Sequence, residues 1–253
     1  MKQFNTQHWF LPLLLLCVLI VAGCSSTTTS AETQAQNNPS VEQTLTPSSP
    51  TSTQPMANSP QLNGKATVVM TVNKSPITIE IDGTNAPITA GNFVDLVNKG
   101  VYDGLAFHRV VRDPQPFVVQ GGDPQSKDPK FPSARLGTGG FIDPKTSKER
   151  MIPLEIKPKG AEQPIYSKTL ESAGIQKAPV LSHTRGAVAM ARSQFPDSAS
   201  SQFYFALADL PFLDGSYAVF GYVTDGMNVV DQIKQGDRIQ SAKVTQGLEN
   251  LKN

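Results

Sequence analysis

The segment 117–123 reads Phe-Val-Val-Gln-Gly-Gly-Asp, a short apolar run followed by paired glycines and an acidic residue. Its first four residues are typical of a β-strand bounded by turn residues. Because successive side chains of a strand point to opposite faces, Val118 and Gln120 share one face and Phe117 falls on the other. An apolar side chain and an amide side chain therefore stand together on one face of this strand.

Short strands of the same kind are predicted on both sides of this segment. Thr67–Val72 and the alternating residues 77–81 form a hairpin around residues 73–76. Two helical periods occur, one from Ala86 to Gly100 and one from Met227 to Gly236. Many short strands with only two helices favour an antiparallel barrel or sandwich over βαβ units. The remaining strands are predicted at 107–111, 187–191, 203–207 and 218–223.

The charged residues divide the chain into two unequal parts. Only Lys2, Glu32 and Glu42 precede Lys65, although the chain has 22 basic and 21 acidic residues. The part that follows has the composition of a globular domain and is long enough to bury a core without staples. A net charge of +1 leaves no basic excess to neutralise phosphates. We therefore predict one folded domain over residues 65–253 and no nucleic-acid partner.

Residues 1–23 have the pattern of a secretory signal peptide. The apolar run at 9–22 is 14 residues long, which is shorter than the roughly 20 residues that cross a membrane. It follows Lys2 and precedes small residues, as a signal peptide requires. Val21-Ala22-Gly23-Cys24 resembles the lipobox of bacterial lipoproteins, whose cysteine is alkylated with diacylglycerol and becomes the first residue of the mature chain. A signal peptide with an incidental cysteine is the alternative interpretation.

Residues 24–64 are predicted to be the lipidated cysteine and a disordered tether. Ser, Thr, Pro, Gln and Asn account for 30 of the 40 residues from Ser25 to Gly64, and such a segment cannot bury enough apolar surface to order itself. Because Cys17 lies in the signal peptide, only Cys24 remains in the mature chain, which has no intramolecular disulfide. We expect a membrane-anchored lipoprotein on the extracytoplasmic side, in the periplasm or cell envelope.

The common catalytic signatures are absent from the sequence. It contains no G-x-S-x-G elbow, no G-x-x-x-x-G-K loop, no C-x-x-C and no H-E-x-x-H. Its three histidines include one in the signal peptide, so a His-rich metal site is disfavoured. We therefore expect neither a cofactor nor a metal.

Several short motifs occur in one order over about 115 residues. This order resembles that of the cyclophilin family of peptidyl-prolyl cis-trans isomerases, and the resemblance runs from about Lys65 to Gly247. It implies a mainly β fold, a closed eight-stranded antiparallel β-barrel capped by two α-helices, with the active site on the outer face of the barrel. The motifs are Phe107-His108-Arg109, 117–123, Gly137-Thr138-Gly139-Gly140, 186–191, Ser201-Gln202-Phe203-Tyr204, Phe212-Leu213-Asp214-Gly215 and Val219-Phe220-Gly221.

The implied chemistry needs no covalent step. Rotation about an X-Pro bond breaks amide resonance, with a barrier of about 18 to 20 kcal/mol. A catalyst must hold the proline ring and stabilise a nitrogen that becomes pyramidal and regains its lone pair. An arginine suits that nitrogen because it is always charged and aims several N–H groups from a rigid plane. The resemblance assigns this role to Arg109 and the orienting role to Gln120.

The resemblance also places a peptide groove around this pair. It counts His108 among the catalytic residues and sets it along the groove. Taken singly, Arg109 would be interpreted as a solvated charge and Leu213 as ordinary core. The implied partners are proline-containing unfolded or flexible polypeptide segments, and we expect a monomer that assists the folding of exported proteins. The implied substrate-binding residues are Phe117, Val118, Ala191, Arg192, Gln202, Tyr204, Phe212, Leu213 and Tyr217.

The sequence departs from the family pattern at several groove positions. Tyr204 stands in place of a phenylalanine and adds a hydroxyl that needs a partner. Phe212 stands where many eukaryotic members have the tryptophan that helps to hold cyclosporin, which predicts weak drug binding. Arg192 and Tyr217 replace an asparagine and a histidine, and residues 141–182 contain an insertion of about 25 to 30 residues. These departures bear on substrate range more than on catalysis.

Two other functions remain open on the sequence. A cyclophilin-like module could hold proline-containing segments of a partner without turnover, but simple binding would not require both Arg109 and Gln120. A hydrolase that uses Ser201, His183 and an aspartate has the residue types but no nucleophile elbow. If the chain is not a hydrolase, we interpret His183 as a structural residue.

Overall fold

The computed structural model describes residues 59–252 of the chain. The predicted signal peptide (1–23), the predicted lipidation site Cys24 and most of the predicted tether lie outside these residues. Within the described range, every helix is too short or too polar to cross a membrane.

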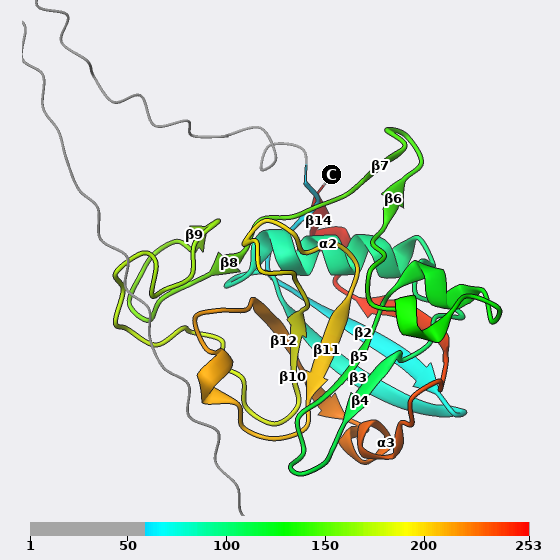
Figure 1. The fold of residues 1–253 in the computed structure, drawn as a ribbon. Helices are drawn as coiled ribbons and strands as arrows, with labels where there is room; N and C mark the ends of the chain where they lie inside the picture. Colours follow the sequence, from blue (N-terminus) through cyan, green and yellow to red (C-terminus); the bar gives the residue numbers. More distant parts are fainter. Residues whose placement is uncertain (1–58, 253) are drawn as a thin grey trace, which may run out of the picture. The chain divides into compact units, whose positions relative to one another are not determined.

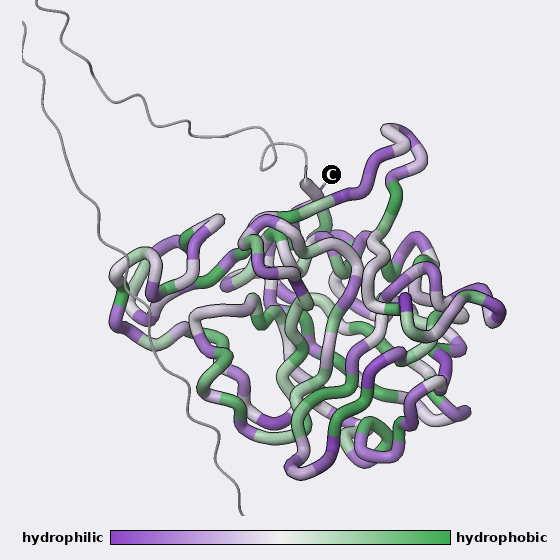
Figure 2. Tube along the Cα trace, in the orientation of Figure 1, coloured by the Kyte–Doolittle hydropathy of each residue, from purple (hydrophilic) through white to green (hydrophobic). Residues whose placement is uncertain are grey.

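A single large antiparallel sheet forms the body of the fold, as predicted from the many short strands (Figure 1). Figure 2 shows hydrophobic segments in its central strands and hydrophilic ones in the outer loops. The eight strands, in their order across the sheet, are β13 (Ile239–Gln246), β2 (Lys65–Val72), β3 (Ser75–Asp82), β12 (Val219–Asp225), β10 (Ala187–Met190), β11 (Phe203–Ala206), β5 (Val118–Gly121) and β4 (Arg109–Val111).

The sheet curls into an open half-barrel, so the prediction of a closed barrel is wrong. β13 and β4 are its two edges, and among residues 59–252 no strand ladder joins them. The chain beside these edges meets at the isolated bridge between Ala106 and Arg238. β4 has only three residues, and Pro114 and Pro116 follow it closely. Because proline has no N–H to donate, these residues limit the length of β4 and leave only a short edge.

The hairpin β2–β3 matches the predicted one. Asn73 and Lys74 have φ of 52° and 65°, which is the backbone of a type I′ turn. Alternate residues of β2 are buried, as an amphipathic strand requires. β13 was not predicted, because only Ile239 and Ala242 are buried in it and its remaining residues do not alternate.

The two predicted helices are present and lie near opposite ends of the curled sheet (Figure 1). They are α2 (Pro87–Asn98) and the shorter α3 (Met227–Gln232). Phe93 of α2 packs its ring 5.1 Å from that of Tyr102, 5.3 Å from Phe203 and 4.9 Å from Phe220. This aromatic cluster joins the helix to the inner face of the sheet.

The fold begins before Lys65, within the segment 24–64 that was predicted to be the tether. Gln61–Leu62 forms the short strand β1, which pairs with β14 (Leu251–Lys252), and Leu62 is fully buried. β1 also crosses α2 at Gly91, where an added Cβ would lie 2.5 Å from the Cα of Gln61. Only a glycine allows this close approach. The remaining short elements are β6 (Ile142–Asp143), β7 (Lys148–Glu149), β8 (Glu155–Ile156), β9 (Ile165–Tyr166) and the 3-10 helices η1 (Pro124–Lys127), η2 (Ser133–Arg135), η3 (Pro211–Leu213) and η4 (Leu248–Asn250).

The predicted insertion supplies the N-terminal cap of α2. Ala86 precedes the helix and offers no side-chain cap. Instead, the buried carboxylate of Glu155 accepts hydrogen bonds from the backbone N–H groups of Ile88 (3.1 Å) and Thr89 (2.8 Å). Burial raises the pKa of Glu155, and these two N–H groups oppose that rise. A carboxylate at this position satisfies N–H groups that the helix itself leaves unpaired.

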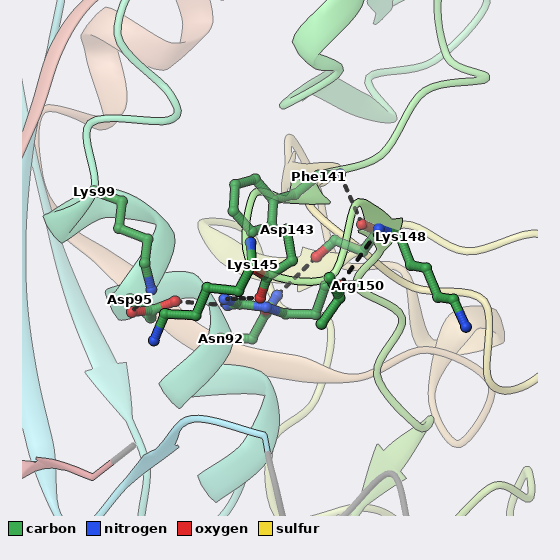
Figure 3. Close-up of polar contacts among 10 residues, drawn as sticks. Asn92, Asp95, Lys99, Phe141, Asp143, Lys145, Lys148 and Arg150 are labelled. Atoms are coloured by element: carbon green, nitrogen blue, oxygen red, sulfur yellow. Dashed lines mark hydrogen bonds and ion pairs between the residues drawn. The ribbon is translucent and has the colours of Figure 1, made fainter.

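A second anchor joins the insertion to the middle of α2 (Figure 3). Arg150 Nη1 lies 2.6 Å from Asp95 Oδ2 and 3.4 Å from Asn92 Oδ1. Its guanidinium also lies 4.8 Å from the centre of the Phe141 ring. The Asp95 side chain is only 3% exposed, and Lys99 is its second partner. The insertion is therefore held to the helix by a largely buried ion pair.

We predict that Arg150→Ala lowers the free energy of unfolding by about 2 to 3 kcal/mol, because it leaves the buried Asp95 carboxylate with only one cation. Urea unfolding followed by circular dichroism measures the change. The matched control is Lys148→Ala, which removes an exposed cation two residues away and should change the value by no more than about 0.5 kcal/mol. Equal effects of the two variants would show that the anchor contributes nothing.

Candidate active site

The strands β10, β11 and β5 have two apolar faces. Val119, Phe203 and Phe205 belong to the main core with α2, whereas Val118 and Tyr204 belong to a second buried cluster. Because neighbouring residues of a strand point to opposite faces, this second cluster lies on the outer face of the half-barrel. Val118 and its neighbour Val119 therefore lie on opposite faces of the strand, as alternation predicts. The outer face of the half-barrel carries a packed layer of apolar side chains.

A cavity of about 240 Å³ lies over this layer, which forms its floor. Phe117 precedes β5, so strict alternation does not apply to it and it shares the cavity wall with Val118. The structure therefore brings together most of the residues that the sequence pointed to. The cavity is called here the proline pocket, after the ring that the sequence resemblance leads us to expect there. It is lined by Arg109, Phe117, Val118, Gln120, Ala191, Arg192, Tyr204, Leu213 and Tyr217.

Arg109 is held at the side of this pocket by a chain of amide groups. It pairs with Gln120 across β4 and β5, and its Nη1 donates to Gln120 Oε1 at 3.3 Å. Gln120 Nε2 donates to Gln202 Oε1 at 3.1 Å, and Gln202 Nε2 donates to the carbonyl of Gly139 at 2.8 Å. The guanidinium carbon lies 5.5 Å from the centre of the Phe117 ring. The guanidinium makes no other hydrogen bond to the described residues, so its remaining N–H groups can reach a ligand.

Arg192 and Tyr217, which both depart from the family pattern, pack against each other. The guanidinium carbon of Arg192 lies 4.7 Å from the centre of the Tyr217 ring, and its Nε and Nη2 donate to the carbonyl of Ser216 at 2.9 and 2.7 Å. The Tyr217 ring meets the Tyr204 ring edge to face, with centroids 6.2 Å apart. Together, Arg192 and Tyr217 close one side of the pocket.

Three predicted site residues lie outside the wall of the proline pocket. Phe212 is 69% exposed and stacks on Phe117 with centroids 6.0 Å apart. Gln202 lies in the neighbouring cavity. His108 lies beside Gly137, and both of its ring nitrogens are buried without a hydrogen-bond partner among residues 59–252. Burial lowers the pKa of His108, against the nearby Asp123 carboxylate.

A second cavity of about 410 Å³ adjoins the proline pocket and shares Gln120, Ala191 and Arg192 with it. Glu149 and Met151 of the insertion form part of its wall. These two residues stand in no recognisable motif, so the sequence does not mark them as part of a site. Other residues of its wall are Thr138, Ser193, Ser198 and Ser200.

The loop at the edge of the second cavity is fixed by one buried carboxylate. Asp123 is fully buried, and its Oδ2 accepts hydrogen bonds from the backbone N–H groups of Gly137 (2.6 Å) and Gly139 (3.3 Å). Its Oδ1 accepts a third from Gln125 at 2.9 Å. The last residue of the segment 117–123 thus positions the carbonyl of Gly139, which in turn holds Gln202.

The geometry does not support a serine hydrolase. Ser201 is fully buried and its hydroxyl donates to the carbonyl of Gly122 at 2.8 Å. His183 instead lies within hydrogen-bond distance of Tyr204 and Asp214. In the described part of the chain, no cluster of three or more His, Cys, Asp or Glu residues is placed to hold a metal ion.

Comparisons with known proteins point to one family. Residues 67–250 match the family model of cyclophilin type peptidyl-prolyl cis-trans isomerase/CLD. A Synechocystis protein with the provisional name thylakoid lumen peptidyl-prolyl cis-trans isomerase is 48% identical over 78% of this chain and 51% of its own length. The chloroplastic peptidyl-prolyl cis-trans isomerase CYP38 of Arabidopsis thaliana is 44% identical over 78% of this chain and 46% of its own length. The chain therefore spans about half the length of these two relatives.

A bacterial relative is covered more fully. A probable peptidyl-prolyl cis-trans isomerase of Brucella abortus is 36% identical over 70% of this chain and 76% of its own length. Among solved structures, a cyclophilin type peptidyl-prolyl cis-trans isomerase of Cryptosporidium parvum has a TM-score of 0.53 at 22% identity, covering 72% of this chain and 98% of that one. The same protein, studied in the presence of the dipeptide Ala-Pro, has a TM-score of 0.52 at 23% identity, covering 71% of this chain and 99% of that one.

We predict that Asp123→Ala frees the loop at 137–139. Loss of the buried carboxylate removes three backbone hydrogen bonds, so the amide of Gly137 should exchange with solvent about 10- to 100-fold faster. Hydrogen exchange followed by NMR measures this rate. Asp128→Ala is the matched control, because Asp128 accepts from the backbone of Lys130 in an exposed turn. An unchanged rate for Gly137 in Asp123→Ala would contradict the assigned role.

Proposed function

The chain belongs to the cyclophilin-type peptidyl-prolyl cis-trans isomerases, and we propose that it accelerates the isomerisation of X-Pro bonds in unfolded or flexible polypeptides outside the cytoplasm. One observation carries this proposal. A guanidinium held by a chain of amides, that of Arg109, stands at the side of an apolar pocket on the outer face of the sheet.

The pocket has the surfaces that a proline ring needs. Phe117, Val118 and Leu213 offer apolar contacts on its walls, and a small apolar ring is held by such contacts with few polar groups. The exposed ring of Phe212, stacked on Phe117, extends the apolar surface beyond the rim. A proline ring held there remains fixed while the carbonyl before it swings.

Arg109 supplies the charge stabilisation. As the X-Pro bond rotates, the proline nitrogen loses its amide conjugation and becomes a hydrogen-bond acceptor. The free N–H groups of Arg109 can donate to it, and the guanidinium does not lose its proton at neutral pH. Gln120 and Gln202 limit the rotation of the guanidinium, so less reorganisation is needed in the transition state.

A single hydrogen bond does not provide the whole acceleration. A ten-thousand-fold increase in rate requires about 5 to 6 kcal/mol, and one charged hydrogen bond supplies about 1.5 to 3 kcal/mol. The remainder must come from holding the peptide in a twisted geometry on both sides of the proline. The adjoining second cavity offers a place for the flanking residues.

Binding without turnover is the second candidate function. It needs the apolar pocket but does not need an oriented guanidinium. The hydrogen bonds that run from Arg109 through Gln120 and Gln202 to Gly139 favour catalysis over binding alone.

We further propose that the chain is a lipoprotein held to a membrane through Cys24 and a tether, and that it assists the folding of exported proteins there as a monomer. The pattern of residues 1–64 supports this proposal. The names of two relatives, which refer to the thylakoid lumen and the chloroplast, are in keeping with a location outside the cytoplasm.

We predict that Arg109→Ala lowers kcat/KM for a short X-Pro peptide by about 10- to 100-fold, because it removes one charged hydrogen bond from the transition state. A cis-trans isomerisation assay on the purified chain gives the value. Arg135→Ala, which removes an exposed arginine of η2, is the matched control and should leave the rate unchanged.

Two outcomes of this assay would count against the proposal. Undiminished activity of Arg109→Ala would remove the mechanism. If the wild-type chain isomerises the peptide no faster than the spontaneous reaction, the enzymatic function is contradicted and binding without turnover remains the candidate.

The lipid anchor makes a separate prediction. Mass spectrometry of the mature N-terminus should show an acylated Cys24 when the chain is made in a bacterium that processes lipoproteins. Cys24→Ser should move the protein from the membrane fraction to the soluble fraction, whereas Cys17→Ser, a change within the predicted signal peptide, should not. A soluble, unmodified wild-type protein would refute the anchor.

A further inference from the structure

A buried histidine lies directly behind the proline pocket. The side chain of His183 has no exposed surface, and it stands between Asp214 and the pocket residue Tyr204. Its Nδ1 is 2.8 Å from Asp214 Oδ1, and its Nε2 is 2.9 Å from the hydroxyl of Tyr204. The imidazole and phenol rings are nearly parallel, at an angle of 14°. His183 thus connects a carboxylate to the pocket floor.

The hydrogen bonds allow one arrangement of protons when His183 is neutral. Asp214 Oδ1 already accepts from the backbone N–H of His183 at 2.8 Å, so the carboxylate acts as an acceptor. Nδ1 must therefore carry the proton, which leaves Nε2 as an acceptor. The Tyr204 hydroxyl then donates to Nε2. Both ring nitrogens of His183 and the Tyr204 hydroxyl have a partner in this arrangement.

This arrangement decides what a substrate meets at the pocket floor. Tyr204 is only 5% exposed, and its ring lines the pocket beside Val118 and Leu213. The phenolic proton is committed to His183, so it does not face the ligand as an unpaired donor. The floor therefore behaves as an apolar ring, like the phenylalanine that it replaces. A floor of this kind suits a proline ring, which has no polar group to offer a hydroxyl.

We propose that His183 is a positioning residue for proline recognition, which Asp214 holds in one tautomer so that it accepts the Tyr204 hydroxyl and keeps the pocket floor apolar. This inference rests on the proposed function of the pocket. It assigns to His183 a role through Tyr204, and it does not place His183 in contact with the substrate.

Protonation of His183 reverses the bond to Tyr204. With a proton on both nitrogens, Nε2 donates, and the hydroxyl must accept and turn its own proton toward another acceptor. Burial lowers the pKa of His183, while Asp214 raises it. Asp214 faces His183 from the residue after η3, and Arg192 and Tyr217 are the other ionisable groups that act on Tyr204. We therefore expect His183 to become protonated only at a pH below the range in which a histidine ordinarily titrates. Proline binding should weaken in that acidic range.

A double-mutant cycle tests the proposal on the full chain. His183→Ala should raise KM for a short X-Pro peptide about 10-fold while kcat changes by less than about 2-fold, because Arg109 is untouched. In a Tyr204→Phe background, the same change should alter KM by less than about 2-fold, because no hydroxyl remains to be positioned. An equal effect in both backgrounds would mean that His183 acts only through general stability, and would overturn the proposal.

His183→Gln provides a second test if the His183→Ala variant does not fold. A glutamine amide can accept from the hydroxyl but does not titrate, so its KM should stay within about 3-fold of the wild-type value at neutral pH. The wild-type KM should rise as the pH falls, whereas His183→Gln and Tyr204→Phe should not show this rise. All of these variants retain His108, so its titration is common to them. The same acid rise in Tyr204→Phe would overturn the proposal.

Peptide binding separates this inference from the proposed function. NMR titration with an Ala-Pro dipeptide measures the dissociation constant without any turnover. If the wild-type chain binds the dipeptide but does not accelerate isomerisation, the proposed enzyme fails and the cycle is read on dissociation constants. If it neither binds nor accelerates, both proposals are overturned.

Discussion

The site depends on the alternation of side chains in strands β5 and β11. Val119, Phe203 and Phe205 pack into the main core, and their neighbours Val118 and Tyr204 form the floor of the proline pocket. Because strand residues alternate between faces, the same four-residue strands stabilise the fold and shape the site. A shift of register by one residue would exchange the two faces. The aromatic packing around Phe93 and Phe203 therefore fixes the pocket as well as the core.

Much of the fold was predictable from local pattern. The hairpin β2–β3, the helix α2 and the strands that follow Phe107 all carry strong periodicity or turn residues. β13 lacks that signal because it pairs mainly with β2 and buries few side chains. The cap that Glu155 gives to α2 depends on contacts between residues that are far apart in the sequence. Local sequence contains no information of that kind, and only a resemblance can stand in for it.

The candidate site was likewise predictable from the sequence only in part. Arg109 and Gln120 lie where the motif order indicated, in register across β4 and β5. The sequence showed that the Tyr204 hydroxyl needed a partner, but it could not show which residue provides it. His183 is 21 residues away in the chain, and no spacing rule connects the two. A polar group introduced at a buried position is thus the sequence signal, and its satisfaction is a property of the folded chain.

The insertion connects the helix side of the fold to the groove. Arg150 points to Asp95 on α2, while its neighbours Glu149 and Met151 line the second cavity. Arg150 lies between these two residues in the chain, so fixing its side chain on the helix also restricts where its two neighbours stand in the second cavity. The ion pair that anchors the insertion therefore sets part of the groove wall, about which the family motifs carry no information. The wall of the second cavity can therefore change in this segment without altering Arg109 or the proline pocket.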